Sequence, residues 1–316
     1  MILVSGVLGD GMIELMCARL NSMGYRYLFL DELRFPGDFN VTWSASAEGV
    51  SGYVSSPTGR VNLRDITGVY ARYVQHRGRK RGEGISDREE ELIKAEYEVS
   101  LMQLFDVMPS VVVNRVRASV SNDSKLYQQL LLASFGFRTP RTLVTTVPEE
   151  AAAFYEACEK KIIYKSLSGV RSIVRRLEDK DLPRLDLVRN CPAQFQEVVE
   201  GVDVRVHTVD EKVFATELIS QASDYRYAAS TGHSLTARAI DLPPELASAC
   251  MQLARSAGLM VSGIDLRRAL DGQYYCFEIN PSPGFLFYER ATGQPISEAV
   301  AKLLRGGVTQ SCSETN

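Results

Sequence analysis

Apolar residues in the first part of the chain alternate between strand-like runs and helix-like spacing. Met1–Gly6 is a continuous apolar run, typical of a buried strand, and Tyr25–Leu30 is a second one. Between them, Met12–Asn21 places apolar residues at the spacing of one helical face. A further strand at residues 68–74 and a long amphipathic helix at Glu89–Phe105 continue the alternation. The pattern predicts an N-terminal α/β unit.

The pattern changes twice after this unit. A helix at Ser124–Phe135, with Asp123 as its predicted cap, precedes a mixture of strands and helix up to residue 200. Beyond residue 200 strands dominate, interrupted by a helix at Pro244–Ala257 and closed by a helix at Ile296–Leu304. We therefore predict an α/β protein with domains at residues 1–113, 114–200 and 201–305, and a polar, disordered tail at 306–316.

The strands predicted at residues 261–270 and 273–279 carry acidic groups in an otherwise apolar setting. Glu278 and Asn280 are two residues apart, so a pleated strand turns both side chains to one side, and Asp265 lies in the neighbouring strand. Apolar strands do not bury carboxylates without a counter-charge. Two carboxylates and an amide oxygen suit Mg²⁺, which usually keeps substrate phosphates among its ligands. The hairpin therefore predicts a metal site that binds a nucleotide.

Composition and charge exclude several classes of function. The 316 residues carry 36 Lys and Arg against 39 Asp and Glu, a net charge of −3 that predicts no nucleic-acid partner. No apolar run approaches the ~20 residues of a membrane span, and the apolar start lacks the basic region of a signal peptide. Three His and six scattered Cys disfavour a zinc site or a His-based triad. We expect a cytoplasmic enzyme without a membrane partner.

Two lysines are candidate phosphate ligands. Lys165 ends an apolar strand, and the Ser- and Gly-rich loop behind it, with Ser168 and Gly169, suits phosphate binding by backbone N–H groups. Lys125 lies in the first turn of a predicted helix, where a cation is unfavourable unless an anion binds nearby. Taken singly, each lysine is more often a solvated surface group. Together with the acidic hairpin, the two indicate a phosphate site.

A short linker between two predicted strands is a candidate for binding the base. It contains Gln196, Glu197 and Val199, and its glutamate and the backbone around its last valine could meet an adenine edge. Asp203, a few residues further on, could meet the ribose hydroxyls. Without the other motifs, this stretch is an ordinary connection between strands.

These motifs, in this order and approximate spacing, resemble the ATP-grasp family. The resemblance covers residues 111–305, and the N-terminal unit is similar to the family's pre-ATP-grasp domain. The branches that the chain resembles are the ribosomal-protein glutamate ligases and the graspetide (microviridin-type) synthetases. Asp203-Val204-Arg205 and Asp224-Tyr225-Arg226 resemble Asp–Arg elements of the graspetide enzymes. Pro281–Phe285 is instead similar to the glutamate-ligase ending, which leaves the branch open.

The resemblance implies a fold, cofactors and ligand roles. The fold would combine the pre-ATP-grasp α/β domain, a small central α/β lid and a C-terminal antiparallel-sheet ATP-grasp domain. The cofactors would be ATP and Mg²⁺, with two ions expected and Mn²⁺ as an alternative. The nucleotide ligands would be Lys125, Lys165, Ser168, Gly169, Gln196, Glu197, Val199 and Asp203, and the metal ligands Asp265, Glu278 and Asn280.

Three arginines are the candidates for stabilising charge at the transferred phosphate. They are Arg205, Arg226 and Arg267, because guanidinium groups suit both phosphate and carboxylate. Arg205 and Arg267 each lie two residues from an aspartate on their own strand, so a structural ion pair is the alternative role for both. Arg226 lies in a Ser-, Ala- and Thr-rich stretch, which favours substrate contact, and Arg72 is a further candidate of this kind.

We predict an ATP-dependent ligase that forms an amide or ester bond at a carboxylate through an acyl-phosphate. Its partners would be ATP, an amino-acid or peptide substrate and an amine or hydroxyl acceptor, with peptide natural-product modification as one setting. The alternatives are a free amino-acid ligase of the glutamate-adding kind, a small-molecule kinase and a non-catalytic nucleotide-binding regulator. A homodimer is one option for the assembly.

Overall fold

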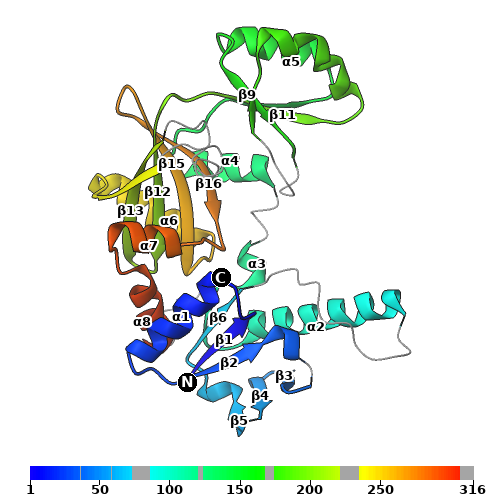
Figure 1. Cartoon of the computed structure of the whole chain (residues 1–316), viewed down its shortest axis with the longest axis vertical. Helices are drawn as coiled ribbons and strands as arrows, with labels where there is room; N and C mark the ends of the chain where they lie inside the picture. Colours follow the sequence, from blue (N-terminus) through cyan, green and yellow to red (C-terminus); the bar gives the residue numbers. More distant parts are fainter. Residues whose placement is uncertain are drawn as a thin grey trace.

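Three parts of the chain are stacked along the long axis of the molecule (Figure 1). The computed structural model describes residues 1–35, 37–57, 59–72, 86–119, 124–167, 174–220 and 235–306. The N-terminal α/β unit lies at the bottom of the view, an antiparallel sheet from the last third of the chain lies in the middle, and a small α/β lid lies at the top. Most of the tail predicted at 306–316 lies outside the described residues.

The N-terminal unit is built on a parallel sheet with the strand order β2-β1-β6-β7. Helix α1 packs on one face of this sheet and α2 on the other. The Asp10 carboxylate caps α1 by accepting hydrogen bonds from the N–H groups of Met12 and Ile13. The elements are β1 (Ile2–Gly6), α1 (Gly11–Ser22), β2 (Tyr27–Asp31), η1 (Glu32–Arg34), η2 (Leu63–Asp65), β6 (Gly68–Ala71), α2 (Asp87–Val107), β7 (Val111–Val113) and α3 (Val116–Ser119).

A second, antiparallel sheet in this unit was not predicted. It comprises β3 (Asn40–Ser46), β4 (Gly49–Ser56) and β5 (Gly59–Asn62), in that order. Gly52 lies so close to β3 that a side chain there would collide with the Thr42 backbone. Many residues of these strands are exposed or half-buried, so their sequence is polar and lacks the apolar run of a buried strand.

The lid is an antiparallel sheet with the order β10-β9-β11-β8, and it is covered by α5 and η4. The helix before the lid starts one residue later than predicted, because Ser124 is its cap, and the predicted cap Asp123 lies outside the described residues. The Ser124 hydroxyl accepts a hydrogen bond from the Tyr127 N–H at 3.3 Å. The elements are α4 (Lys125–Ser134), β8 (Thr142–Thr145), α5 (Pro148–Ala157), β9 (Ile162–Lys165), β10 (Arg175–Arg176), η4 (Asp179–Arg189) and β11 (Ala193–Glu197).

The third part is an antiparallel sheet with the order β14-β13-β12-β15-β16. Helices α4 and α6 pack on one face of the sheet, and α7 lies against the other, where Tyr288 contacts His207. The strands predicted at residues 261–270 and 273–279 and the long helix at Pro244–Ala257 agree with the structure to within one residue at each end. The elements are β12 (Gly201–Val209), β13 (Lys212–Ser220), β14 (Leu235–Ile240), α6 (Pro244–Ser256), β15 (Val261–Ala269), β16 (Tyr274–Asn280), α7 (Leu286–Thr292) and α8 (Ile296–Gly306).

The last helix returns to the N-terminal unit. Helix α8 runs beside α1 (Figure 1), and its Val300 and Leu304 are buried in one core with Val4 and Ile13. Gly68 on β6 leaves room for this contact, because a side chain there would collide with the Leu304 backbone. The two ends of the chain therefore share a hydrophobic core.

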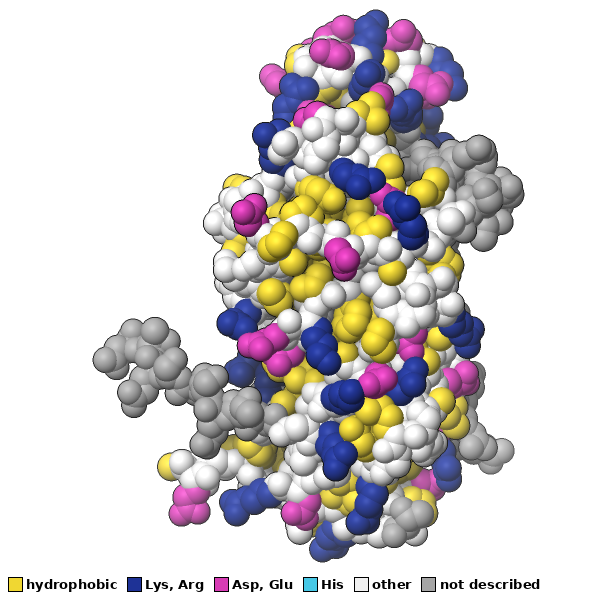
Figure 2. Space-filling view, turned by 90° about the vertical axis from the view of Figure 1, so that its left-hand side faces the viewer, with side chains coloured by type: hydrophobic (Ala, Val, Ile, Leu, Met, Phe, Trp, Pro, Cys, Tyr) yellow, Lys and Arg dark blue, Asp and Glu magenta, His cyan; other side chains and the backbone are white. Residues whose placement is uncertain are grey.

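The outer surface mixes charges of both signs. On the face shown in Figure 2, Lys and Arg side chains are interspersed with Asp and Glu, and hydrophobic side chains gather across the middle of the face. No helix in the described part of the chain has the length and apolar content of a membrane span.

Candidate active site

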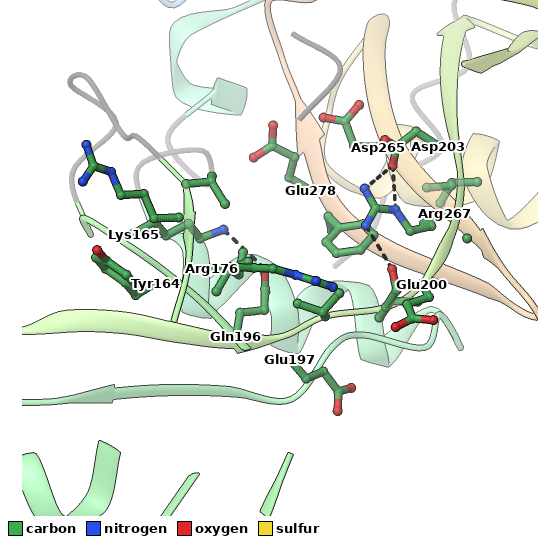
Figure 3. Close-up of a pocket in the computed structure, with 18 of the residues that line it drawn as sticks. Tyr164, Lys165, Arg176, Gln196, Glu197, Glu200, Asp203, Asp265, Arg267 and Glu278 are labelled. Carbon is green, nitrogen blue, oxygen red and sulfur yellow. Dashed lines mark hydrogen bonds and ion pairs between the residues drawn. The ribbon is translucent and has the colours of Figure 1, made fainter. Parts of the chain in front are cut away.

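A cavity of about 820 Å³ lies between the lid and the C-terminal sheet, within the size range of small-molecule sites. One wall comes from β9, β10 and β11, and the opposite wall from β12, β15 and β16. In Figure 3, lid residues such as Lys165 and Gln196 face Asp265 and Glu278 across this space. The predicted site residues that line it are Lys165, Gln196, Glu197, Val199, Asp203, Arg205, Asp265, Arg267 and Glu278.

The acidic hairpin brings together two of its three predicted ligands, Asp265 and Glu278, whereas Asn280 is not among the residues that line the cavity. Asp265 on β15 lies directly opposite Glu278 on β16, and Gly263 lies opposite Asn280. The register shifts after Asp265, so that Leu266 pairs with Cys276 and Phe277 is left over as a bulge. The bulge lets Phe277 and Glu278, although adjacent in sequence, both line the cavity.

The arginines of this site pair across the strands and not along them. Arg205 Nη1 donates to Asp265 Oδ1 at 2.5 Å, and Arg267 Nη2 donates to Asp203 Oδ1 at 2.6 Å. The register explains the exchange of partners, because Asp203 is opposite Arg267 and Arg205 is opposite Asp265. Ion pairing of both arginines is therefore correct, but the expected partner, the aspartate two residues away on the same strand, is wrong in both cases.

The lysines approach the cavity from two elements. Lys165 Nζ lies 3.5 Å from Gln196 Oε1, and the Gln196 amide is held in turn by the Thr142 hydroxyl at 3.1 Å. Lys125 does not line the cavity wall, but its Nζ donates to the Ser166 carbonyl at 3.1 Å, next to Lys165. Lys125 is thus bonded to the backbone at the start of the Ser/Gly loop, directly after Lys165. Ser168 and Gly169 in this loop, and Arg226, lie outside the described residues.

Glu197 has its carboxylate occupied within the lid. Its oxygens accept hydrogen bonds from Arg141 N at 2.9 Å and Arg141 Nε at 2.5 Å. In Figure 3 its side chain points away from Lys165 and Gln196. The Val199 carbonyl accepts a hydrogen bond from Arg267 Nη1 at 3.0 Å, which ties the linker to β15. The Glu197 carboxylate is thus engaged by Arg141, and the Val199 carbonyl by Arg267.

The donor set of the hairpin fits a hard divalent cation. Asp265 uses Oδ1 for Arg205, and the Asn280 Oδ1 accepts a hydrogen bond from Ser282 N at 2.8 Å, so each residue retains oxygen lone pairs for an ion. Within the described ranges, no group of three or more His, Cys, Asp or Glu side chains forms an all-protein metal cage. Such a sparse set suits Mg²⁺, which relies on phosphate and water for its other ligands.

Sequence reasoning missed several residues of the cavity. Arg176 on β10 lies opposite Ile163 and lines the cavity beside Gln196 (Figure 3). The adjacent arginines 175 and 176 were a signal, since they follow the Ser/Gly loop directly. The Arg267 guanidinium lies 5.4 Å from the Phe277 ring centroid, a contact that depends on the unpredicted bulge.

Two further residues border the site without lining the main cavity. Arg72, at the end of β6, pairs with Asp10 at 3.4 Å and donates to the Ser282 hydroxyl at 3.2 Å, just beyond Asn280. His207 is fully buried beside Arg205 on β12. Burial and the nearby Arg205 guanidinium hold the pKa of His207 well below its usual range, so the imidazole is neutral.

Comparison with known proteins gives consistent likenesses. The RimK-like ATP-grasp domain model matches residues 122–304. A probable alpha-L-glutamate ligase of Alkalilimnicola ehrlichii is 25% identical over 228 residues, which cover 69% of this chain and 75% of that protein.

Solved structures match almost the whole chain. The RiPP-associated ATP-grasp ligase of Chryseobacterium gregarium, bound to ADP and a leader and core peptide, has a TM-score of 0.83 at 21% identity, covering 96% of each chain. The ATP-grasp ligase PsnB, bound to a minimal precursor, Mg and ADP, has a TM-score of 0.77 at 26% identity, also covering 96% of each chain.

Proposed function

We propose, from the premise that the chain belongs to the RimK-like ATP-grasp family, that it joins a carboxylate carried by a peptide to an amine or hydroxyl. The predicted family, the predicted fold and the predicted ATP-grasp ligase are correct. The observation that carries the proposal is the cavity itself, where Lys165 faces Asp265 and Glu278, with Arg205 and Arg267 beside them.

A peptide substrate is favoured by the extent of the structural likeness. The peptide-bound ligases resemble the N-terminal unit as well as the ATP-grasp part, whereas the glutamate-ligase relative aligns over about two thirds of the chain. The N-terminal unit reaches the site through Arg72, which contacts Ser282 just after Asn280. A substrate that spans both parts would be contacted by both.

The residues of the cavity suit the two steps of such a ligase. A substrate carboxylate oxygen attacks the γ-phosphorus of ATP, the bond to the β-phosphate oxygen breaks, and ADP leaves. The amine or hydroxyl then attacks the acyl carbon of the acyl-phosphate, phosphate leaves with the bonding electrons, and the proton of the acceptor passes to solvent. Lys125 and Lys165 would hold the phosphates, and Arg205 and Arg267 would offset the negative charge that moves in both steps.

Magnesium completes this arrangement. Asp265, Glu278 and Asn280 would hold it, and when bound it would neutralise charge between the β- and γ-phosphates. We propose two ions, with Mn²⁺ as a functional substitute, because both carboxylates lie side by side and oxygen donors accept either metal. The linker backbone at Val199 and the carboxylate of Asp203 would take adenine and ribose.

A second candidate is a ligase for free L-glutamate. Two observations favour it: the likeness to the probable alpha-L-glutamate ligase of Alkalilimnicola ehrlichii, and the similarity of Pro281–Phe285 to the glutamate-ligase ending. The two candidates share the chemistry at the γ-phosphate and differ only in which molecule carries the carboxylate.

Mass spectrometry with two probes separates the candidates. One probe is free L-glutamate, and the other is a mixture of synthetic peptides that contain Glu and Asp together with Ser, Thr and Lys. With ATP and Mg²⁺, we expect peptide products that have lost one water for each new bond, with release of inorganic phosphate. Conversion of free L-glutamate alone would support the second candidate. If neither the peptides nor L-glutamate led to phosphate release, both candidates would be contradicted.

A further inference from the structure

Gly263 borders the candidate site through its contact with Arg205 and contributes no side chain to it. It is buried on β15, opposite His207 on β12 and Asn280 on β16, and it is two residues from Asp265. A methyl group built on its Cα would overlap Arg205 Nη2 and lie 2.6 Å from Arg205 Cζ. Carbon atoms that are not bonded prefer separations of about 3.5–4.0 Å. The Arg205 guanidinium therefore occupies the space that any side chain at position 263 would fill.

Backbone geometry does not explain the glycine. The φ angle of Gly263 lies outside the positive range that favours glycine, so an alanine could adopt the same backbone. The three atoms that an alanine methyl group would approach most closely are two atoms of the Arg205 guanidinium and Pro283 Cβ, the last at 2.7 Å. The requirement for glycine thus comes from Arg205 and the loop that follows Asn280.

The guanidinium has little room to move elsewhere. Arg205 is 6% exposed, and its Nη1 is held by Asp265 Oδ1. Its Cζ lies 6.0 Å from the Tyr288 ring centroid, on the side of the sheet that α7 covers. His207, the next residue along the same face of β12, packs edge-on against Tyr288 at 4.8 Å between ring centroids. A displaced guanidinium would have to leave Asp265 or push these rings.

We propose that Gly263 is a positioning residue, whose missing side chain lets the Arg205 guanidinium lie flat on β15 beside Asp265. The inference rests on the proposed function, in which Arg205 offsets charge at the transferred phosphate. Misplacement of a catalytic group by about 1 Å can cost ~100-fold in rate, so Gly263→Ala should lower kcat by about this factor. The affinity for ATP should stay unchanged, because the lysines and the linker backbone bind it elsewhere.

A double-mutant cycle tests this inference. The variants are Gly263→Ala, Arg205→Ala and the two combined, and the readout is phosphate release from ATP and Mg²⁺ with the peptide mixture and L-glutamate both present. Gly284→Ala is the matched control, because a methyl group there meets no atom within 4 Å and the φ angle is ordinary. Binding of a non-hydrolysable ATP analogue and thermal unfolding are measured for every variant.

We expect Gly263→Ala to reduce kcat in the wild-type background and to have no further effect once Arg205 is alanine. Equal losses in both backgrounds would overturn the positioning role while leaving the proposed function intact. An Arg205→Ala variant with normal kcat would overturn the positioning role together with the proposed charge-stabilising role of Arg205. If Gly263→Ala unfolds, the combined variant should recover part of the lost thermal stability, because the overlap with Arg205 is removed and that with Pro283 Cβ remains. No recovery at all would also overturn the inference.

Discussion

Arg205 on β12 lies directly opposite Asp265 on β15, and the two side chains form an ion pair across the strands at 2.5 Å. The neighbouring positions repeat the pair with the signs reversed, since Asp203 on β12 faces Arg267 on β15. Two cations and two carboxylates thus alternate on neighbouring positions of the two strands, and Glu278 lies opposite Asp265 on the next strand. Such an array keeps guanidinium groups at the edge of the proposed metal site without leaving a buried charge uncompensated.

The Glu278 carboxylate should be essential for turnover. Glu278→Gln keeps the size of the side chain but removes the negative charge that faces the proposed ion beside Asp265. We expect phosphate release to fall to background with an unchanged thermal unfolding midpoint. The matched control is Glu211→Gln, which removes an exposed carboxylate paired with Arg255 and should turn over normally. Normal turnover in a folded Glu278→Gln variant would remove the metal assignment.

Lys165 should govern ATP affinity. A hydrogen bond to a charged group contributes about 1.5–3 kcal/mol, so Lys165→Gln should raise the KM for ATP by about 10–100-fold. Lys302→Gln is the control, because Lys302 forms an exposed pair with Glu298 on α8, in another part of the molecule. Steady-state kinetics with varied ATP measure the effect. An unaltered KM for ATP would show that Lys165 only supports Gln196.

Glu197 should matter for the lid and little for the nucleotide. Its carboxylate is bound by Arg141, whose side chain is largely exposed, so Glu197→Gln should change ATP affinity by less than about 5-fold. Calorimetric titration with a non-hydrolysable ATP analogue gives the comparison. A loss as large as that expected for Lys165→Gln would mean that the Glu197 carboxylate itself meets the base.

Glu32 should make the stability of the N-terminal unit depend on pH. Burial is the main cause that raises the pKa of Glu32 to about 7 from an ordinary 4.5, although the hydrogen bond from the Ser5 hydroxyl opposes the shift. The folded state therefore holds the proton more tightly than the unfolded chain. This contribution is complete below pH 4.5, is lost as the pH rises to about 7, and stays lost above it.

Glu32→Gln tests this dependence, because the amide oxygen can still accept the Ser5 hydroxyl. At pH 8 the variant should be more stable than the wild type by up to about 3 kcal/mol, and at pH 4 the two should be nearly equal. Urea unfolding at both pH values measures the difference. Glu48→Gln, at an exposed position of the same unit, should show no such dependence. A gain at pH 4 equal to that at pH 8 would contradict the account.

The order of the main strands and helices was predictable because buried elements carry clear apolar periods. β1, α1, β15 and β16 follow the predicted ranges closely. The sheet of β3, β4 and β5 was missed because its residues are largely exposed and polar. The packing of α8 against the N-terminal core could not be predicted from the sequence either. An amphipathic pattern shows that one face of a helix is buried, but it does not show which part of the protein covers that face. The domain boundaries stay predictions.

The residue types of the site were easier to predict than the contacts that these side chains make with one another. Residue types along the strands indicated a metal site, and the pleat placed Glu278 and Asn280 on one side of β16. The pairing of Arg205 with Asp265 depends on the register of β12 against β15, which a single sequence does not specify. The bulge at Phe277 and the capture of Glu197 by Arg141 likewise arise from tertiary contacts. The roles of Ser168, Gly169 and Arg226 stay predictions.

Hydroxylamine trapping tests the central claim, ATP-dependent activation of a carboxylate in the cavity that Lys165, Asp265 and Glu278 line. The purified protein is incubated with ATP, Mg²⁺, the peptide mixture, L-glutamate and hydroxylamine, with Glu278→Gln as the control. We predict an acyl hydroxamate formed in equal amount with inorganic phosphate by the wild type, and neither product from the variant. A stably phosphorylated product without phosphate release would contradict the account and indicate a kinase.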